Sequence, residues 1–597
     1  MEEKSREVEM NQETEQEQSR LMSRRDVLKL GGLATISAVG VSGLAACSPA
    51  ATSSGSSGGG GGTGGSELTH TSVEGKWAFE IPPDPIAEDK ITETREAEII
   101  IIGAGTAGLS CAVAAAQAGG KVILFAKGKG PIGRGGSNFG FHSKYRESLG
   151  LKPVEPYPFI YNQLATQAFT VDQDKWYKWY QHSEEHINWL IDIMAETGKY
   201  QLFMEQIGSM NRITDPDSPE YIPVATHAWI TDEMQLVGDG QPFVVQTLAD
   251  KAVSLGAKIY YNTCAQQLVR GGKPNGTEGR VEAVIATDAD GNYIKFVGTK
   301  AIVMATGDFS INRDMMKKYC PHAYDWVTNF DMGEDFDPEN GKVYGGLYDG
   351  IGQRMGLWIG AAWQKNYPNT AMGGGFGGPG AGGVGITLNE KGKRFFCEAH
   401  TLGFNTMFMR NHVYGNKTYQ IWDTAFAETG QPWSKGVKTG YTTPLFTAEE
   451  MIENWDKAVE EGRYVKADTI EEVVSKLGLP PETVNEVARY NKFCETGVDL
   501  DFYKNKVHLI PIKTGPFYGG GGETGGNFLT VLGGLRTDID MKVCDKDDKP
   551  IPGLYNIGTM VGDTYFATYT FRISGQNLAM NCGTFGKLTG EYIVANE

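Results

Sequence analysis

The amino-acid sequence predicts an α/β protein, and three features near residue 100 support this. Residues 97–102 (AEIIII) form a continuous apolar run, which is typical of a strand buried on both faces of a parallel sheet. Residues 103–108 (GAGTAG) supply a Gly-x-Gly-x-x-Gly turn, and the small apolar residues after it predict a helix. Residues 121–125 (KVILF) predict a second buried strand. Together the three features predict a Rossmann-like dinucleotide-binding domain.

The turn residues have separate physical roles in such a domain. Gly103 allows the tight turn, Gly105 lets the backbone approach a pyrophosphate, and Gly108 lets the helix pack closely on the strand. Thr106 and Ala107 stand at the helix N-terminus, which favours phosphate groups. We therefore expect all five residues to bind the dinucleotide.

Two further stretches extend the expected cofactor site. An acid usually ends the second strand and holds the ribose hydroxyls, but this chain has Lys127 there, so Lys127 or the backbone is expected to replace the acid. Residues 133–138 then form a glycine-rich loop that allows a close approach to the cofactor. Its expected cofactor-binding residues are Gly135, Gly136 and Ser137.

Composition limits the classes of protein to consider. With 597 residues, 40% of them hydrophobic, the chain is long enough for several domains with their own cores. A formal net charge of -18 argues against nucleic acid or an anionic lipid surface as the partner. The eight cysteines form no C-x-x-C pair, so no metal site, iron–sulfur cluster or c-type haem is expected. The seven cysteines after Cys47 are interpreted as small buried residues.

The first 95 residues read as targeting and linker sequence rather than as part of the fold. Residues 23–29 (SRRDVLK) resemble a twin-arginine export signal, and Leu44-Ala45-Ala46-Cys47 resembles a lipobox. Residues 1–47 are therefore expected to be a lipoprotein signal. Residues 48–95 are expected to be a flexible Gly/Ser tether followed by a lead-in segment without clear hydrophobic periodicity. This predicts an exported protein of the cell envelope, at the outer face of the cytoplasmic membrane or in the periplasm, anchored through a lipid on Cys47.

Further elements follow from hydrophobic periodicity and turn signals. Residues 176–202 predict a helix that faces the core, and residues 238–257 a helix that leads into a strand at 258–261. Residues 281–286 and 293–297 predict a hairpin around the Asp-Ala-Asp-Gly turn, and residues 300–304 a separate strand.

Several motifs in order resemble one known family. They are VMATGDF at 303–309, LYDGIG at 347–352, LNEKGKRF-x-x-E at 388–398, IPGLYNIG at 551–558 and GQNLA at 575–579. With the GAGTAGL turn and the glycine-rich loop, they resemble the FAD-dependent fumarate reductase/flavocytochrome c family, which includes urocanate reductases and ketosteroid dehydrogenases. The resemblance spans about residues 96–590 and implies FAD as cofactor. It adds these expected FAD-binding residues: Ala305, Thr306, Gly307, Asp349, Gly558, Gln576, Asn577 and Leu578.

The resemblance also implies the domain organisation. A Rossmann-like FAD-binding domain is formed by residues 96–364 and 529–597, and an α+β capping domain at 365–528 is inserted between them. In this family the substrate lies between the flavin and the cap. The helix that begins near Gly575 would face the flavin ring, where its dipole stabilises a reduced flavin anion.

The family chemistry is implied only in part. In this family the reduced flavin gives a hydride from N5 to one alkene carbon, and a side-chain acid protonates the other carbon. Fumarate reductases bind both substrate carboxylates with histidines and arginines. Of these groups this chain keeps Arg572, while Leu402 takes the place of the arginine that donates the proton. Tyr367 and Thr530 take the places of the two histidines. Fumarate is therefore not the expected substrate.

Aromatic residues replace the missing charges. Tyr367, Tyr518, Tyr565, Phe566 and Tyr569 predict a larger, more aromatic pocket that holds at most one carboxylate or carbonyl. Arg572 is expected to clamp that group by two parallel hydrogen bonds. The expected proton donors are Tyr367 and His400, followed by Tyr569. The alternatives are that His400 is a structural histidine and that the tyrosines pack around the flavin ring.

These features favour an FAD-dependent oxidoreductase that acts on CH–CH bonds. The leading hypothesis is a terminal reductase of anaerobic respiration that reduces an activated C=C bond in an enoate, aryl-acrylate or enone. Because the chain has no haem motif, its electrons should arrive from a separate redox protein. The first alternative is a ketosteroid-dehydrogenase-like enzyme that introduces a C=C bond next to a carbonyl, and the second is a flavoprotein that only relays electrons.

Overall fold

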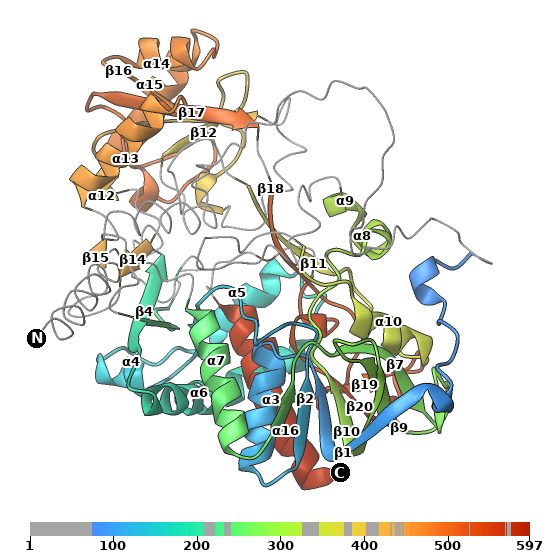
Figure 1. The fold of residues 1–597 in the computed structure, drawn as a ribbon. Coiled ribbons are helices and arrows are strands. Elements are labelled where there is room, and N and C mark those ends of the chain that lie inside the picture. The colour runs from blue at the N-terminus through green and yellow to red at the C-terminus, as the bar shows by residue number, and fades with distance from the viewer. Residues whose placement is uncertain are drawn as a thin grey trace, which may run out of the picture.

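The computed structural model describes residues 75–597 with several gaps inside that range. The gaps are residues 208–220, 222, 232–239, 325–345, 375–384, 401–416, 430–432, 436–442, 445–446, 524–525, 567–568 and 570–574. The predictions for the export signal, Cys47, the tether, Leu402 and Arg572 therefore fall outside the described residues. Figure 1 shows a large α/β body that carries both ends of the described chain and a smaller α+β body formed by residues 386–523. The α/β class and the inserted capping domain are thus confirmed.

The large body is organised around a parallel sheet. Five strands run parallel in the spatial order β6, β2, β1, β10, β20, and β19 pairs with β20 at the edge. Their bounds are β6 (Lys258–Tyr260), β2 (Val122–Phe125), β1 (Ile91–Ile102), β10 (Tyr293–Met304), β20 (Pro550–Asn556) and β19 (Lys542–Cys544). The predicted βαβ unit is confirmed, because Ile99–Ile102 pair in parallel with Val122–Phe125 and helix α3 (Thr106–Gln117) connects them.

The structure corrects two strand predictions, because β1 and β10 are both longer than predicted. β1 begins at Ile91, inside the stretch interpreted as lead-in, and the runs 293–297 and 300–304 are one strand, β10. The first half of β10 pairs with the outer half of β1 on one side and with β9 (Val281–Thr287) on the other. The antiparallel β9–β10 hairpin is as predicted. The meander continues through β7 (Cys264–Arg270) and β8 (Lys273–Pro274).

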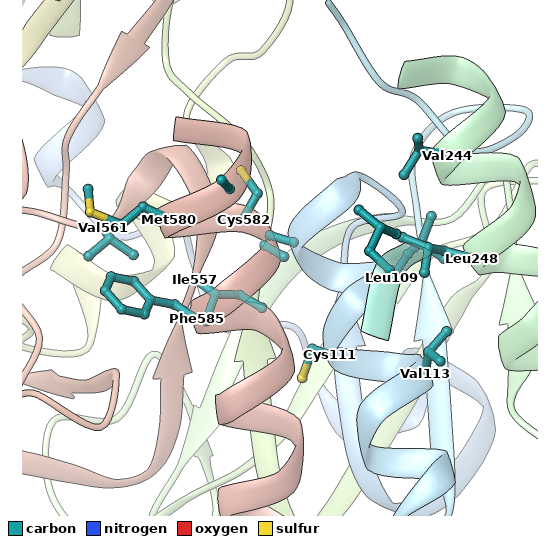
Figure 2. Close-up of a cluster of buried hydrophobic side chains, with 14 of the residues drawn as sticks. Leu109, Cys111, Val113, Val244, Leu248, Ile557, Val561, Met580, Cys582 and Phe585 are labelled. Atoms are coloured by element: carbon teal, nitrogen blue, oxygen red, sulfur yellow. The ribbon is translucent and has the colours of Figure 1, made fainter. Parts of the chain in front are cut away.

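Helix α3 is packed between two other helices (Figure 2). On one side Leu109 and Val113 face Val244 and Leu248 of α7 (Gln241–Ser254), and on the other side Cys111 faces the C-terminal helix. That helix begins as a π-helical turn, η11 (Leu578–Thr584), and continues as α16 (Phe585–Asn596). A Cβ atom on Gly590 would lie 2.5 Å from the Cys111 carbonyl oxygen, so α16 and α3 are in close backbone contact.

The predicted core-facing helix is confirmed as α6 (Gln173–Glu196), in which Trp176, Trp179 and Ile187 are fully buried. It ends before Leu202, which belongs to β4 (Gln201–Ile207). A second sheet runs in the order β15, β14, β4, β5, β3. The remaining elements of this region are α4 (Lys144–Ser148), α5 (Pro156–Thr166), β3 (Asn138–Phe139), β5 (Thr226–Ile230), β14 (Trp433–Lys435) and β15 (Thr443–Pro444).

The smaller body has its own sheet, in the order β12, β13, β17, β16, and its own two apolar cores. Its elements are β12 (Ile386–Leu388), β13 (Lys417–Asp423), α12 (Phe426–Thr429), α13 (Ala448–Glu460), β16 (Tyr464–Ala467), α14 (Ile470–Lys476), α15 (Thr483–Thr496) and β17 (Phe517–Glu523). The antiparallel strands β11 (Asn369–Gly374) and β18 (Gly526–Leu532) lie where the chain leaves and re-enters the large body.

The remaining helices are short. They are η2 (Ala78–Glu80), η3 (Glu88–Lys90), α8 (Arg313–Tyr319), α9 (Pro321–Tyr324), α10 (Ile351–Trp358), η7 (Glu398–His400), η9 (Lys506–His508) and η10 (Gly558–Met560). Of the described helices, none has both the length and the hydropathy that a membrane span requires. The seven described cysteines are all free thiols; five are buried, but Cys264 and Cys494 are partly exposed, which corrects the interpretation for those two.

Candidate active site

The turn between β1 and α3 is shaped by backbone contacts that exclude side chains at two of its glycines. Gly103 has φ +117, and a Cβ atom there would lie 2.2 Å from the Ala305 carbonyl oxygen. A Cβ atom on Gly108 would lie 2.0 Å from the Gly103 carbonyl oxygen. Gly105 is different, because the nearest protein atom to its Cβ position is the Ile132 oxygen at 3.7 Å. A Cβ atom at Gly105 would make only an ordinary van der Waals contact, so the protein itself does not require glycine there, and this is where a pyrophosphate is expected to approach.

The glycine-rich loop meets the start of the C-terminal helix. A Cβ atom on Gly575 would lie 1.8 Å from the Ser137 carbonyl oxygen, and the Phe139 N–H donates to the Gly575 oxygen at 3.5 Å. A Cβ atom on Gly135, which has φ +76, would lie 3.9 Å from the Leu578 side chain. Two predicted cofactor segments that are more than 400 residues apart in sequence are thus in contact, as their expected roles require.

The other predicted cofactor residues gather at the carboxyl ends of the parallel strands. Thr306 donates from its N–H and from its hydroxyl to the sulfur of Met560 at 3.4 and 3.3 Å. A Cβ atom on Gly558 would lie 3.0 Å from Ala107 Cβ, and the Gly307 oxygen accepts from the Gln353 amide at 3.0 Å. In open α/β sheets ligands bind at this edge.

Two more predicted residues flank elements of the large body. Lys127 is exposed just after β2, and Asp349 precedes α10. The Asp349 carboxylate accepts from Arg354 Nη2 at 2.7 Å and from the Ile351 N–H at 3.2 Å, so it already has protein partners. The ribose contact assigned to this region stays a prediction.

Comparisons with known proteins agree with this geometry. The family model described as "FAD binding domain" matches residues 98–570. A vinyl phenol reductase from Lactiplantibacillus plantarum is 26% identical over 81% of this chain and 96% of its own length. A cytochrome-type fumarate reductase from Shewanella frigidimarina is 23% identical over 83% of this chain and 76% of its own length.

The match to the FAD binding domain model covers most of the chain. The protein belongs to the FAD binding domain family. It is an oxidoreductase of the group that acts on C=C and CH–CH bonds, and its cofactor is FAD. Among solved structures, the 3-ketosteroid-delta4-(5alpha)-dehydrogenase of Rhodococcus jostii RHA1 has a TM-score of 0.64 at 22% identity, over 85% of this chain and 99% of that one, so the two share a fold.

The residues present fit FAD. Gln576 is buried at the start of the C-terminal helix, and its amide nitrogen has no hydrogen-bond partner among the described residues. An unpaired buried donor costs free energy unless a ligand accepts from it. The Tyr565 hydroxyl is also buried and has no described partner. These two polar atoms fit a cofactor bound near the start of the C-terminal helix.

Of the predicted catalytic residues in this FAD-binding protein, Tyr569 lies beside a predicted cofactor residue. Its hydroxyl accepts from the Asn577 N–H at 3.4 Å, and its ring is 5.6 Å from that of Tyr565. Burial raises the pKa of both phenols, so both keep their protons at neutral pH. Asn577 Oδ1 in turn accepts from the Asn581 amide at 3.1 Å, which orients the start of the helix.

Among the described residues, no contact joins the other catalytic candidates to a predicted cofactor residue. Tyr367 is 69% exposed, and its ring centroid is 6.4 Å from that of Phe566. The backbone of His400 belongs to η7, but its side chain lies outside the described part of the structure, as does Arg572. Their roles stay predictions.

One member of the expected aromatic pocket is misplaced. Tyr518 is fully buried inside the smaller body, where it packs on Trp422 and Trp455 and donates to Asp456 at 2.9 Å. It belongs to strand β17, and the pattern of glycines around it gave no sign of a buried aromatic core on that face. The prediction that Tyr518 lines the pocket is therefore wrong.

Gln241 joins two predicted cofactor segments and was not among the residues predicted from the sequence. It is fully buried at the start of α7, and its amide donates to Thr106 Oγ1 at 2.9 Å and accepts from the Asn138 amide at 3.1 Å. Its N–H donates to the Gly135 oxygen at 2.8 Å. One side chain thus joins the β1–α3 turn to the glycine-rich loop. No local signal marks it, because glutamine is ordinary in the first turn of a helix.

We expect Gln241→Met to weaken FAD binding about tenfold. The substitution keeps the length of the side chain but removes the donor to Thr106 Oγ1 and leaves the Asn138 amide with the Gly136 oxygen at 3.5 Å as its acceptor. A lost buried hydrogen bond costs ~1–3 kcal/mol. The dissociation constant for FAD, measured by recovery of flavin fluorescence on dilution, should rise. Gln246→Met on the same helix is the matched control, because Gln246 is exposed and its amide donates to Asp250, four residues along α7. Equal FAD affinity in the two variants would contradict the role of Gln241.

Proposed function

We propose that this protein reduces an activated C=C bond in an enoate, aryl-acrylate or enone, and that it serves as a terminal reductase in anaerobic respiration. The observation that carries the proposal is the pair Tyr565 and Tyr569 beside Asn577, at the helix start that is expected to face the flavin. The two rings are buried, 1% and 5% exposed, and their hydroxyls are neutral. An aromatic environment with neutral hydroxyls suits an aromatic or carbonyl-bearing substrate better than a small dicarboxylate.

The vinyl phenol reductase relative supports an aromatic substrate. Its name describes reduction of an alkene attached to a phenol ring, and it aligns over most of both chains. The fumarate reductase relative is named for a different substrate. By the family resemblance of the sequence, Tyr367 and Thr530 stand where that family has histidines. Neither side chain carries a positive charge for a second carboxylate. The proposed substrate therefore has at most one carboxylate or carbonyl.

The proposed chemistry divides between cofactor and protein. When bound and reduced, FAD supplies the hydride. Arg572 holds the carboxylate or carbonyl oxygen that gains negative charge, and a side-chain acid completes the reaction by protonating the second carbon. Of the expected donors whose side chains the structure describes, Tyr569 contacts a predicted cofactor residue. Two electrons return to the protein from a separate redox partner, which balances the reaction.

A ketosteroid-dehydrogenase-like reaction in the opposite direction is the second candidate. The buried tyrosine pair favours it, because a phenol next to a carbonyl oxygen can polarise the bond that is desaturated. The third reading, a flavoprotein that only relays electrons, leaves the tyrosine pair without a role. One set of measurements separates the three readings.

The experiment is anaerobic spectroscopy of the purified holoprotein. The reduced protein is mixed with an aryl-acrylate, an enone, fumarate or a 3-ketosteroid with a ring double bond, and flavin absorbance and product mass are followed. Rapid reoxidation by the aryl-acrylate or enone, with product two hydrogens heavier, supports the proposal. Bleaching of the oxidised protein by a saturated ketosteroid supports the reverse reaction. If no compound in either direction changes the flavin, the electron-relay reading stands.

Anchoring through Cys47 at the cell envelope belongs to the same proposal. We expect Cys47→Ala to move the protein from the membrane to the soluble fraction, because the lipidated residue is lost, as immunoblots of the two fractions would show. Cys494→Ala is the control, since this partly exposed thiol lies far outside the lipobox. Replacing Arg24 and Arg25 by lysine should block export. Membrane retention of the Cys47→Ala protein would contradict the lipobox.

A further inference from the structure

A buried histidine lies beside the glycine-rich loop. His227, in β5, is fully buried, and its backbone pairs with that of Asn138, the last residue of the loop. The Nδ1 atom of the ring is 3.2 Å from the Asn138 carbonyl oxygen, and the Nε2 atom is 2.6 Å from Ser143 Oγ. Both ring nitrogens therefore have a partner inside the protein.

These partners decide which ring nitrogen carries the proton. A carbonyl oxygen only accepts, so Nδ1 donates to Asn138. Burial lowers the pKa of His227 to about 3, so at neutral pH the ring is uncharged and its Nε2 atom accepts. The Ser143 hydroxyl donates to Nε2, while its oxygen accepts from the Arg146 N–H at 3.1 Å. The tautomer with the proton on Nδ1 thus satisfies both contacts of the ring.

From Asn138 the hydrogen bonds continue in one direction to the β1–α3 turn. The side-chain nitrogen of Asn138 lies 3.1 Å from Gln241 Oε1 and 3.5 Å from the Gly136 oxygen, and of the two amide atoms only the nitrogen can donate to both. Because Gln241 accepts with Oε1, it faces Thr106 Oγ1 with its amide nitrogen, at 2.9 Å. The Thr106 oxygen is therefore the acceptor in the last bond.

The direction of these bonds leaves the hydroxyl hydrogen of Thr106 available. Thr106 is buried in the first turn of α3, and in the described part of the chain no hydrogen bond takes up this hydrogen. The N-terminus of a helix in such a turn is where the pyrophosphate of a dinucleotide binds, and phosphate oxygens are acceptors. A hydroxyl fixed as a donor at this place suits that ligand.

We propose that His227 is a positioning residue for FAD, which acts through Asn138 and Gln241 to fix the Thr106 hydroxyl as a donor to the pyrophosphate. Ser143 sets the tautomer of the histidine, and the histidine holds the end of the glycine-rich loop. The inference goes beyond the proposed function, because it concerns how the cofactor is held and does not depend on the substrate.

The Thr106 end is tested with Thr106→Val, which keeps the shape and removes the hydroxyl, and Thr106→Ser, which keeps the hydroxyl. The dissociation constant of FAD should rise about tenfold or more in Thr106→Val and less than about threefold in Thr106→Ser, because only valine loses a bond to a charged acceptor. A phosphorus NMR signal of the bound FAD should shift in Thr106→Val alone. Equal FAD affinities in the two variants, or phosphorus signals unchanged by valine, would overturn the proposal.

The His227 end is tested with two amides. The side-chain nitrogen of asparagine is as many bonds from the backbone as Nδ1, and that of glutamine as many as Nε2. His227→Asn thus keeps the donor to the Asn138 oxygen, whereas His227→Gln keeps only the contact with Ser143. Each variant loses one buried bond, so their Tm values should be similar.

The affinity for FAD should separate the two amide variants. We expect the dissociation constant to rise about tenfold in His227→Gln and less than about threefold in His227→Asn. A purely structural role predicts equal losses of affinity. Equal losses, or the larger loss in His227→Asn, would therefore contradict the proposal.

Neutron diffraction from crystals of the wild-type holoprotein tests the proposal without a substitution, so it decides if the His227 variants do not fold. Deuterium is expected on Nδ1 of His227 and on the Thr106 hydroxyl, with the hydroxyl directed at a phosphate oxygen of FAD. Deuterium on Nε2 instead, or a Thr106 hydroxyl directed at Gln241, would show that the proposal is wrong.

Discussion

Arg572→Met is expected to lower turnover about 10²–10³-fold while FAD stays bound. The guanidinium is planar and always charged, so it can hold a carboxylate or carbonyl oxygen by two parallel hydrogen bonds. That oxygen gains negative charge as the hydride arrives, so the contact is stronger in the transition state than in the bound substrate. Methionine keeps similar length and removes the charge. The predicted FAD contacts lie on Gly575 and the residues after it and on the N-terminal glycines, so the flavin content should not change.

The measurement is the rate at which substrate reoxidises the reduced flavin in stopped flow. Arg572→Lys keeps the charge but loses the second parallel bond, so it should recover only part of the rate. Tyr367→Phe and Tyr569→Phe test the other role, since loss of the proton donor should slow the reaction with less effect on substrate binding. Full activity of Arg572→Met with the true substrate would remove the clamp from this protein and, with it, the argument for an enoate or enone.

The nucleotide-binding part of the fold could be predicted because its signals are local. Four consecutive isoleucines, a Gly-x-Gly-x-x-Gly turn and a small-residue helix each follow directly in sequence, and the structure joins them as β1 and α3. The structure also shows why Gly103 and Gly108 cannot carry a side chain. By contrast, the start of β1 at Ile91 depends on pairing with β10, about 200 residues away, and no local pattern reports such a partner.

The site was predictable only where a motif marked it. The cofactor glycines meet as expected because motif residues are fixed by the backbone contacts that they make. Gln241 was missed because its contacts lie in distant segments, with Thr106 in the β1–α3 turn and Asn138 in the glycine-rich loop. Tyr518 was misassigned for the same reason, since only the tertiary structure shows that it faces Trp422.

The second large expected effect, on thermal stability, concerns a buried ionic cluster in the smaller body. Arg394 donates from Nε and Nη2 to Glu398 at 2.9 and 2.8 Å, and from Nη1 and Nη2 to Asp499 at 3.2 and 2.9 Å. Lys504 is 3.0 Å from Glu398 and donates to the Gly385 oxygen at 2.5 Å. Each of the four charged side chains is at most 5% exposed. The cluster ties β12 and η7 to the segment that follows α15.

Arg394→Met should destabilise the smaller body by ~3–5 kcal/mol, because it leaves two buried carboxylates with a single lysine between them. Calorimetry of the holoprotein should show Tm lower by roughly 10 °C. Arg489→Met is the matched control: Arg489 pairs with Asp501 at the surface of the same body and should change Tm little. An equal fall in Tm in the two variants would contradict the idea that burial of the Arg394 cluster causes the large effect.

The same cluster predicts sensitivity to acid. Burial alone would raise the pKa of Glu398, but Lys504 and Arg394 outweigh burial, so its pKa is lowered. Burial would likewise raise the pKa of Asp499, but Arg394 outweighs it, so this pKa is also lowered. Their contribution to stability is therefore complete above about pH 5 and is lost as the pH falls through the folded-state pKa values. Burial lowers the pKa of Lys504, and the neighbouring Glu398 carboxylate opposes that shift. Thermal unfolding of the wild type should show a steep loss of Tm between pH 6 and pH 3. The Glu398→Gln protein should be less stable at pH 6 and should lose less Tm over the same range. Parallel pH profiles for the two proteins would rule out Glu398 as a source of the acid sensitivity.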